Sequence, residues 1–360
     1  MIPLEAAQAD VVDAVHALTP VATPLARACG LVLAEEISAS ENVPPFPNTA
    51  MDGYAVRAAD TAGAPRRLRV VGELPAGRAP TIAVGAGEAI RIMTGAPMPD
   101  GADAVVMVES TEVDGDEVVI NASAQPGEHV RPAGGDVEAG RLVFPPGTAL
   151  TPAHIGVLAS LDRHEVKCHP RPRVGVVSTG DELVERGALA PGQIRDSNRP
   201  MLLALLDASG CEAVDYGIAR DDEAEIEARI SQAAGECDAL LTSGAVSVGD
   251  YDFVKVVLEK LAAQRPGSAF TWSQVAIRPA KPLAFGTLGS VPVFGLPGNP
   301  VSSRVSFELF ARPALRKLMG CTDLFPAPVA MTAKTAMTRR PDGKLHLDRV
   351  RVWVEHGRYV

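Results

Sequence analysis

Apolar residues near the amino terminus recur at helical spacing. Between Leu4 and Leu18 they return every three or four positions, which predicts a helix. Similar spacing from Leu25 to Ile37 predicts a second short helix, followed by the proline-rich residues 43–48, VPPFPN. Because proline disfavours continuation of a helix, we expect the chain to leave its first domain there.

From about Tyr54 to Gly140 the pattern changes to short strands. Four apolar, β-type runs are separated by Gly, Pro and Asp turns, at residues 68–74, 89–95, 104–109 and 117–120. These runs predict a small β domain. Residues 141–172 then hold a helical patch from His154 to Leu161 between two proline-rich stretches, and we expect this segment to rejoin the first domain.

Strands and helices alternate from Arg173 onward. The predicted strands include 173–180, 212–218 and 239–244, and the predicted helices include 201–210, 223–235 and 253–261. Such alternation predicts a doubly wound, mainly parallel sheet. With 360 residues the chain also exceeds the usual size of a single core, so the fold class expected is multidomain α/β. Ligands of such sheets bind outside the carboxyl ends of the strands, which directs attention to the loops there.

Three loops of the predicted sheet carry candidate chemistry. The first, STGDEL, combines Gly180 with Asp181 and Glu182. The second, TSGAVSVGDYD at residues 242–252, offers amides and hydroxyls to phosphate oxygens. In the third, GLPGNPVSSR, Pro300 suits the first turn of a helix whose free amides, with Ser302 and Ser303, would attract an anion. Each loop taken alone is explained as well by turn formation and helix capping, so the hypothesis depends on all three lying at one edge.

The acidic residues of these loops predict a cation. Glu182, Asp222 and Asp252 beside a phosphate would repel it unless a divalent cation lay between them. Magnesium prefers oxygen ligands and bridges to phosphates, which makes it the expected ion. Arg278 and Lys281 add positive charge, although a solvated strand edge explains them equally well.

Composition narrows the class of partner. The net charge of −10 repels a phosphodiester backbone, and aromatic residues, at 4%, offer few surfaces for base stacking. We therefore expect no nucleic-acid partner. An anionic ligand must be held locally, by amides, a few cations or a metal ion.

Cysteines and the amino terminus indicate the compartment. The five cysteines are widely spaced, odd in number and without a CxxC pair, which fits a reducing compartment. Glu5 and Asp10 stand where a signal peptide would carry positive charge, and no apolar run approaches the length of a membrane span. The expected location is cytoplasmic, with no membrane partner.

Seven segments carry a strong resemblance to a known family. They are VPPFPNTAMDGYAVRAAD, GELPAG, IRIMTGAPMPDGADAVVMVE, GEHVRPAGGDVEAG, VVSTGDEL, SGAVSVGDYD and LPGNPVSS, in order over most of the chain. The sequence resembles the molybdopterin molybdenumtransferases, or molybdenum insertases, which include the enzymatic domain of gephyrin. The resemblance implies insertion of molybdenum from molybdate into adenylylated molybdopterin, with magnesium-dependent release of AMP.

The resemblance also implies an organisation. It predicts a discontinuous linker or dimerisation domain at 1–44 and 141–172, a β domain at 45–140, an α/β domain at 173–321 and a partial C-terminal β domain at 322–360. Family members resemble elongated homodimers in which the β domain of one subunit faces the α/β domain of the other. Other cofactor-assembly proteins are possible partners.

Candidate site residues follow from the matching positions. The catalytic set implied by the resemblance is Asp52, Asp136, Glu182, Asp222, Asp252 and Lys281. Glu182 and Asp222 are the hypothesised magnesium ligands, whereas Asp52 and Asp136 are expected to position water or protons. The substrate-binding set comprises Thr94, Ser178, Thr179, Gly180, Asp181, Ser243, Gly244, Ser247, Gly249, Asp250, Arg278, Pro297, Gly298, Asn299, Pro300, Ser302 and Arg349.

The sequence departs from the family pattern at several places. Ala245 and Ala280 stand where glycine is common, and Arg278 stands where lysine is common. An added methyl group matters wherever the backbone needs a positive φ angle. Beyond Arg349, which resembles a family position near molybdate, the sequence stops at Val360, so the fourth domain is expected to be incomplete and molybdate binding to be the step most affected.

Two other functions stay open. A molybdopterin adenylyltransferase uses a similar α/β module but does not need the β domain that carries Asp52 and Asp136. A non-catalytic molybdopterin-binding scaffold is the second. The sequence does not discriminate between molybdate and tungstate.

Overall fold

The computed structural model describes residues 1–244, 253–339, 341–355 and 358–359. The chain forms two compact units. The first, called here the α/β unit, comprises residues 1–35, 146–152 and 165–360, and the second, the β unit, comprises 36–145 and 153–164. The prediction of four domains stays a prediction.

A six-stranded mixed sheet forms the centre of the α/β unit. Its strand order is β17 (Glu212–Ala219), β14 (Arg173–Thr179), β18 (Ala239–Ser243), β22 (Val291–Leu296), β21 (Pro282–Leu288) and β19 (Ala269–Gln274). The first four strands run parallel, while β21 and β19 are antiparallel to their neighbours. The predicted fold class, a doubly wound and mainly parallel sheet in a multidomain α/β protein, is confirmed.

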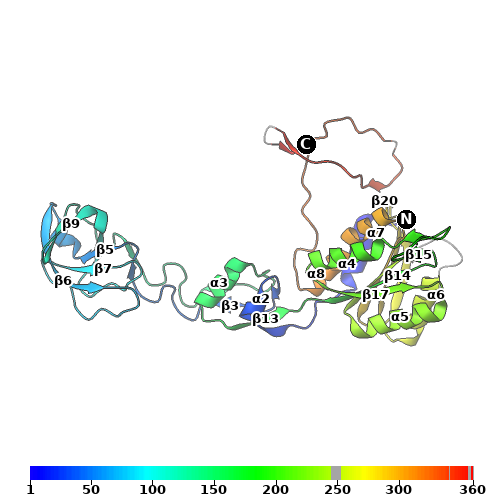
Figure 1. Ribbon diagram of the computed structural model, residues 1–360, viewed down its shortest axis with the longest axis horizontal. Helices are drawn as coiled ribbons and strands as arrows, with labels where there is room; N and C mark the ends of the chain where they lie inside the picture. Colours follow the sequence, from blue (N-terminus) through cyan, green and yellow to red (C-terminus); the bar gives the residue numbers. More distant parts are fainter. Residues whose placement is uncertain (245–252, 340, 356–357, 360) are drawn as a thin grey trace. The chain divides into compact units, whose positions relative to one another are not determined.

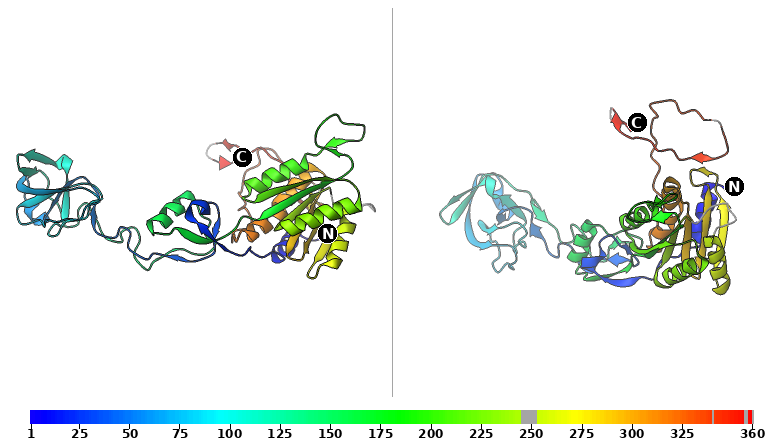
Figure 2. Two further views of the ribbon diagram at one scale, coloured as in Figure 1. Left: turned by 60° about the horizontal axis from the view of Figure 1, so that its bottom comes forward. Right: turned by 45° about the vertical axis from the view of Figure 1, so that its right-hand side comes forward.

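Helices cover both faces of this sheet (Figures 1 and 2). One face packs against α1 (Leu4–Asp13), α4 (Asn198–Ala208), α7 (Pro300–Ser306), the π-helical turn η3 (Phe307–Ala311) and α8 (Arg312–Leu318). The other packs against α5 (Glu223–Glu236) and α6 (Phe253–Gln264). Successive side chains of a strand point to opposite faces of the sheet. Val176 therefore packs in the core beneath α1, α4 and α8, and Val177 packs in the core beneath α5 and α6.

Smaller sheets complete the α/β unit. A three-stranded sheet has the order β1 (Val21–Pro24), β13 (Glu165–His169) and β2 (Val32–Leu33), with the short helix α2 (Leu25–Ala28) between β1 and β2 in the chain. Three pairs are formed by β15 (Leu183–Val184) with β16 (Ile194–Arg195), β20 (Ile277–Arg278) with β23 (Leu345–His346), and β24 (Val354–Glu355) with β25 (Arg358–Tyr359).

The β unit contains a second six-stranded sheet. Its order is β8 (Ala104–Met107), β5 (Gly53–Val56), β7 (Glu88–Ile92), β6 (Arg66–Leu74), β10 (Glu117–Ile120) and β9 (Thr111–Asp114). The other elements are β3 (Ile37–Ser38) paired with β12 (Leu142–Phe144), β4 (Asn48–Thr49) paired with β11 (Val130–Arg131), the 3₁₀ turns η1 (Ala58–Thr61) and η2 (Val108–Ser110), and the helix α3 (Pro152–Ser160). Alternate residues of the sheet pack into two separate apolar clusters, so both of its faces are buried.

The predicted helix from Leu25 to Ile37 is wrong. Only α2 is helical there, because Gly30 adopts φ +84° and Val32 and Leu33 pair with β13 as a strand. The first helix is confirmed as α1 but ends at Asp13, five residues before Leu18. Within the part of the chain that is described, no helix combines the length and apolar character needed to cross a bilayer.

Candidate functional site

The carboxyl ends of three neighbouring parallel strands bring the predicted loops together. Ser178 of β14 lies opposite Ser243 of β18, and Ser243 lies opposite Leu296 of β22. The segments that begin at Thr179, Gly244 and Pro297 therefore start side by side, as expected of a parallel sheet. A small pocket of about 80 Å³ opens between them. Its lining includes Thr179, Glu182, Asn198, Ser243, Gly244, Gly298 and Pro300.

Asn198 links the loops that follow β18 and β22, and sequence reasoning missed it. Its Nδ2 donates to the Oγ of Ser243 at 2.9 Å and to the carbonyl of Gly298 at 2.8 Å. Because a carbonyl only accepts, the bond to Gly298 identifies the nitrogen of the amide. The Oδ1 of Asn198 is buried and has no hydrogen-bond partner among the described residues, and the same is true of the Oγ of Ser178. The only sequence signal was a short polar run before a helix, which ordinarily means a cap.

Two glycines allow the loops to approach closely. Gly180 adopts φ +143° and Gly244 φ +100°, both in the region that favours glycine. A Cβ atom at Gly244 would lie 2.6 Å from the carbonyl oxygen of Thr179, too close for a carbon atom. The predicted requirement for glycine at the ligand edge therefore has a steric basis here.

Carboxylates of two loops meet beside this edge. The backbone N–H of Asp181 donates to the carboxylate of Asp221, and the N–H of Asp221 donates to the carboxylate of Asp181, both at 3.3 Å. Asp222 caps α5, because its Oδ1 accepts from the N–H of Glu225 at 2.9 Å. Glu182 is exposed and lines the pocket. The structure therefore places Glu182 and Asp222 on adjacent loops linked through the bonds between Asp181 and Asp221.

Glu182 and Asp222 suit a hard cation whose remaining ligands are water and oxygen atoms of a substrate. Among the described residues no three His, Cys, Asp or Glu side chains form a group that could hold a metal. Magnesium characteristically takes one or two carboxylates and completes its coordination with water and phosphate oxygens. Glu182 and Asp222 match that pattern, although Asp222 already uses one oxygen as a helix cap.

The segment that follows β22 corrects one prediction. Pro300 does occupy the first turn of α7, as expected. The N–H groups of Val301 and Ser302 are not free, however, because both donate to the Oδ1 of Asn299 at 3.0 and 3.2 Å. The N–H of Ser303 donates to the carbonyl of Asn299. The helix start is thus capped from within the chain, and the predicted anion site built on free amides is wrong for these residues.

Arg278, Lys281 and Arg349 are all exposed. Arg278 is the last residue of β20, and its carbonyl accepts a hydrogen bond from the N–H of Leu347 at 2.8 Å. Residues 345–349 therefore pass beside the 277–281 segment. Arg349 and Pro279 line one hollow of about 720 Å³, together with Val301 of α7. Ala280 is buried with φ +68°, so it adopts the backbone conformation for which the glycine common in the family is suited.

In the β unit, hydrogen bonds from Thr94 lower the pKa of Asp52. Both the N–H and the Oγ1 of Thr94 donate to Asp52 Oδ1, at 2.6 and 2.7 Å. These bonds lower the pKa of Asp52 below its ordinary value of 3.8, the backbone bond being the larger cause. Asp136 is exposed. Its backbone N–H donates to the carbonyl of Val43 at 2.9 Å, which ties the loop of Asp136 to residue 43. Among the described contacts none joins the side chains of Asp52 and Asp136.

Five residues that the sequence analysis singled out in the second loop lie outside the described residues. They are Ala245, Ser247, Gly249, Asp250 and Asp252. Their predicted roles stay predictions.

The fold and site define a multidomain α/β protein with its candidate ligand edge at the carboxyl ends of β14, β18 and β22. Two family models match the chain: "MoeA N-terminal region (domain I and II)" over residues 2–161 and "Probable molybdopterin binding domain" over 175–317.

Named relatives agree with the family models. The chain is 42% identical to "Molybdopterin molybdenumtransferase 2" of Mycobacterium tuberculosis, over 94% of this chain and 85% of that protein. It is 41% identical to "Molybdopterin molybdenumtransferase" of Haemophilus influenzae, over 90% of this chain and 79% of that protein. Among solved structures, a molybdopterin biosynthesis MoeA protein from Pyrococcus horikoshii superposes with a TM-score of 0.74 at 36% identity, covering 89% of this chain and 80% of that one. The chain belongs to the molybdopterin molybdenumtransferase family, whose members act in molybdenum cofactor biosynthesis.

Proposed function

We propose that the protein inserts molybdenum from molybdate into adenylylated molybdopterin and releases AMP in a magnesium-dependent reaction. One observation carries the proposal: the three predicted loops begin side by side at one edge of the sheet in a chain of this family, and Asn198 links two of them. An adenylylated dithiolene substrate is anionic and long, and suits a site of amides, hydroxyls and carboxylates along such an edge.

Glu182 and Asp222 are the proposed ligands of magnesium. They lie on adjacent loops joined by the reciprocal bonds of Asp181 and Asp221. The bound ion would neutralise charge on the phosphate oxygens of the substrate, which is what cleavage of a phosphoanhydride chiefly requires. Lys281 would add a second positive charge, because its side chain is exposed and free to reach a bound anion. Asp252 is proposed as a further catalytic carboxylate of the same site.

Asp52 and Asp136 are the proposed proton-handling residues. Loss of oxo groups from molybdate as water consumes protons, so acids and bases are needed near the metal being transferred. The pKa of Asp52 is lowered by its two bonds from Thr94, which favours the ionised carboxylate. A carboxylate of low pKa stays ionised at neutral pH and is a weak base, so Asp52 suits orientation of water through hydrogen bonds. Asp136 is proposed as the second carboxylate that positions water or protons.

Arg349, Arg278 and Ser302 are proposed to bind the smaller anion, molybdate. Arg349 and Pro279 line the same hollow as Val301, so the 278–281 segment, the start of α7 and residues 347–349 meet there. Arginine side chains bind tetrahedral oxyanions through several N–H groups at once. Preference for molybdate over tungstate is not implied by this arrangement.

The assembly is proposed to be a cytoplasmic homodimer with a site shared between subunits. The resemblance supports this part of the proposal, together with the division into four domains at 1–44 with 141–172, 45–140, 173–321 and 322–360. Contacts with other cofactor-assembly proteins belong to the same proposal.

A direct assay tests the function. Purified protein is mixed with adenylylated molybdopterin, magnesium and molybdate, and AMP release is followed by chromatography. We expect release to require magnesium and to fall by about 100-fold or more in Glu182→Ala, on the scale of losing one charge-stabilising group at a phosphoryl centre. Glu259→Ala, an exposed residue of α6, is the matched control and should retain full activity.

Other outcomes separate the rival functions. Consumption of ATP with free molybdopterin, and no use of the adenylylated form, would identify an adenylyltransferase. Binding without turnover, unchanged by Glu182→Ala, would identify a scaffold and remove the proposed catalytic role.

A further inference from the structure

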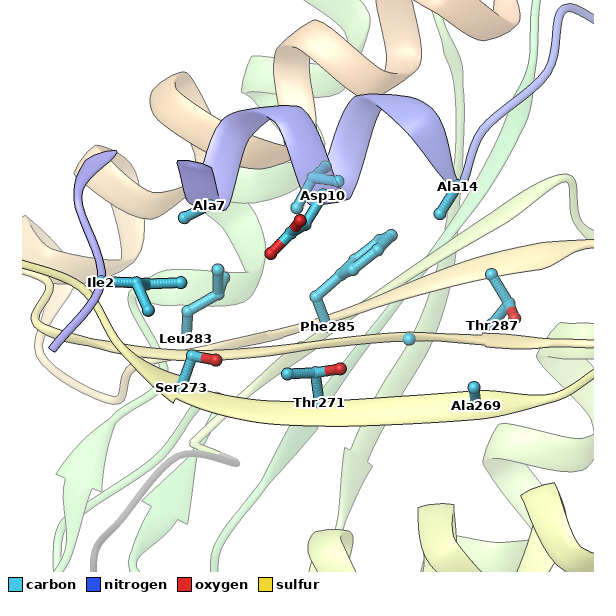
Figure 3. Close-up of a pocket in the computed structure, with 12 residues that line it drawn as sticks. Ile2, Ala7, Asp10, Ala14, Ala269, Thr271, Ser273, Leu283, Phe285 and Thr287 are labelled. Carbon is cyan, nitrogen blue, oxygen red and sulfur yellow. The ribbon is translucent and has the colours of Figure 1, made fainter. Parts of the chain in front are cut away.

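A pocket lies between α1 and the sheet of the α/β unit, and none of its lining residues belongs to the proposed catalytic or binding set (Figure 3). Its volume is about 190 Å³. One side is formed by α1 and Ile2, and the other by β19 and β21. With about 30 Å³ per water in the liquid, the space exceeds that of a few waters and admits a short organic group.

The lining combines an apolar wall with one carboxylate. The apolar part comes from Ile2, Ala7, Val11, Ala14, Leu283 and Phe285. Figure 3 shows Asp10 pointing from α1 towards the sheet, with Thr271 and Ser273 of β19 on the opposite side. Across the described ranges, no hydrogen bond or ion pair engages the carboxylate of Asp10 or the hydroxyl groups of Thr271 and Ser273. Asp10 is therefore a negative charge without a protein counter-ion beside an apolar surface.

The arrangement of donors and acceptors selects the ligand. A primary ammonium group has three N–H donors, which match the carboxylate of Asp10 on one side and the hydroxyls of Thr271 and Ser273 on the other. A short alkyl chain attached to it would cover the apolar wall, as the stem of lysine does on protein surfaces. The apolar wall offers no oxygen ligand to a divalent cation, whereas it would pack against an alkyl chain. We propose that this pocket binds a primary alkylammonium group, with Asp10 as its counter-ion.

Two sources of that group are compatible with the surroundings. A free aliphatic amine fits the pocket alone. A lysine side chain fits it as part of an extended segment, because β19 is the last strand of its sheet and residues 269–274 contain neither a charge nor a proline to protect the edge. Ile2 already pairs at the end of this strand, accepting from Ala276 and donating to the carbonyl of Gln274, both at 2.8 Å.

A binding experiment tests the proposal. Saturation-transfer NMR is used to titrate the 360-residue chain with n-butylammonium and, separately, with a capped pentapeptide that carries one lysine between Val and Thr residues. We expect saturable binding of at least one of these probes, and a loss of affinity of about tenfold or more in Asp10→Asn, because a charge-assisted bond is replaced by a neutral one. Asp13→Asn changes an exposed carboxylate of the same helix outside the pocket and should leave the affinity unchanged.

The controls make each outcome decisive. Binding of the peptide alone identifies a lysine-bearing partner as the source, and binding of n-butylammonium identifies the pocket as sufficient for a free amine. Equal affinity in Asp10→Asn, equal affinity for n-butanol, or no saturable binding of either probe overturns the proposal. Thermal melting of Asp10→Asn, together with its AMP release, shows whether that variant is folded. A failure of AMP release in the parent protein would leave the result at this pocket unaffected.

Discussion

At Asp52 one neighbouring residue is the main cause of a lowered pKa. Thr94 donates twice to the same carboxylate oxygen, and the two bonds favour the charged form. Asp52 is exposed, so the bonds act on its chemistry more than on the stability of the fold. The identity of a residue in a motif thus says which group is present, while its hydrogen-bond donors decide at which pH the group is charged.

We predict that Thr94→Val raises the pKa of Asp52 towards 3.8. The rise is partial, because the N–H of Thr94, the larger cause, remains in the variant. A carboxyl with a lowered pKa in the folded state contributes stability above its unfolded pKa and loses it as the pH falls through the folded value, so the effect is confined to the acid range. Carbon-13 NMR titration measures the shift, and Thr111→Val, whose hydroxyl bonds Val108 instead, should leave the titration of Asp52 unchanged.

Gly244 provides a second prediction at the scale of the residue. A Cβ atom there would meet the carbonyl of Thr179, and φ is +100°, so Gly244→Ala should destabilise the α/β unit by about 1–3 kcal/mol and lower AMP release. Gly235 in α5 is the matched control, because its added Cβ meets nothing within 4 Å. Gly235→Ala should be neutral or stabilising by up to about 1 kcal/mol. Urea denaturation monitored by circular dichroism compares the two, and an unchanged midpoint for Gly244→Ala would contradict the steric argument.

At the scale of the elements, Arg199 connects three parts of the α/β unit. From the first turn of α4 it bonds Asp215 of β17 at 2.6 Å, Asp196 at 2.9 Å, and Glu185 after β15. Burial lowers the pKa of Arg199, but the bonds to Asp215 and Asp196 outweigh it, so the net shift is upward and the side chain stays charged. The side chain of Asp196 is only 1% exposed, and Arg199 is the counter-ion that offsets the cost of burying it.

We expect Arg199→Met to lower the free energy of unfolding by about 3–5 kcal/mol, since it leaves a buried carboxylate unpaired. The double variant Arg199→Met with Asp196→Asn should recover part of the loss, because the unpaired charge is then removed. Lys260→Met breaks exposed ion pairs between α5 and α6 and should cost at most about 1 kcal/mol. Equal losses in Arg199→Met and Lys260→Met, measured by urea denaturation, would show that burial of Asp196 does not matter.

At the scale of the whole molecule, the proposed site draws on both units of the chain. Asp52 and Asp136 belong to the β unit, and Glu182 and Asp222 to the α/β unit. If each site is completed by two subunits, Asp52→Ala and Glu182→Ala inactivate different halves of it. Mixed dimers of the two variants then contain one intact site.

We predict that inactive Asp52→Ala and inactive Glu182→Ala regain AMP release after unfolding and refolding together. With random pairing in a two-fold dimer, about a quarter of the parental activity returns. Refolding either variant alone is the control and should give none. Activity that does not return, although analytical ultracentrifugation shows dimers, would place the whole site within one subunit.

The sequence by itself determined the α/β class, most strands and helices of the α/β unit, and the loops that carry candidate chemistry. These features depend on residues close together in the chain: the alternation of apolar runs, the glycines of the loops and the family motifs. Local pattern failed at residues 25–37, where Gly30 and pairing with β13 override helical spacing.

Only the tertiary structure decided which groups remain available to a ligand. Asn198 bonds Gly298 across 100 residues of sequence, and Asp10 faces a pocket whose other wall is formed by β19 and β21. Hydrogen bonds are satisfied between whichever groups folding brings within about 3 Å, regardless of their separation along the chain. Periodicity and motif spacing carry no information about those partners, which is why the sequence located the edge of the site but not its internal connections.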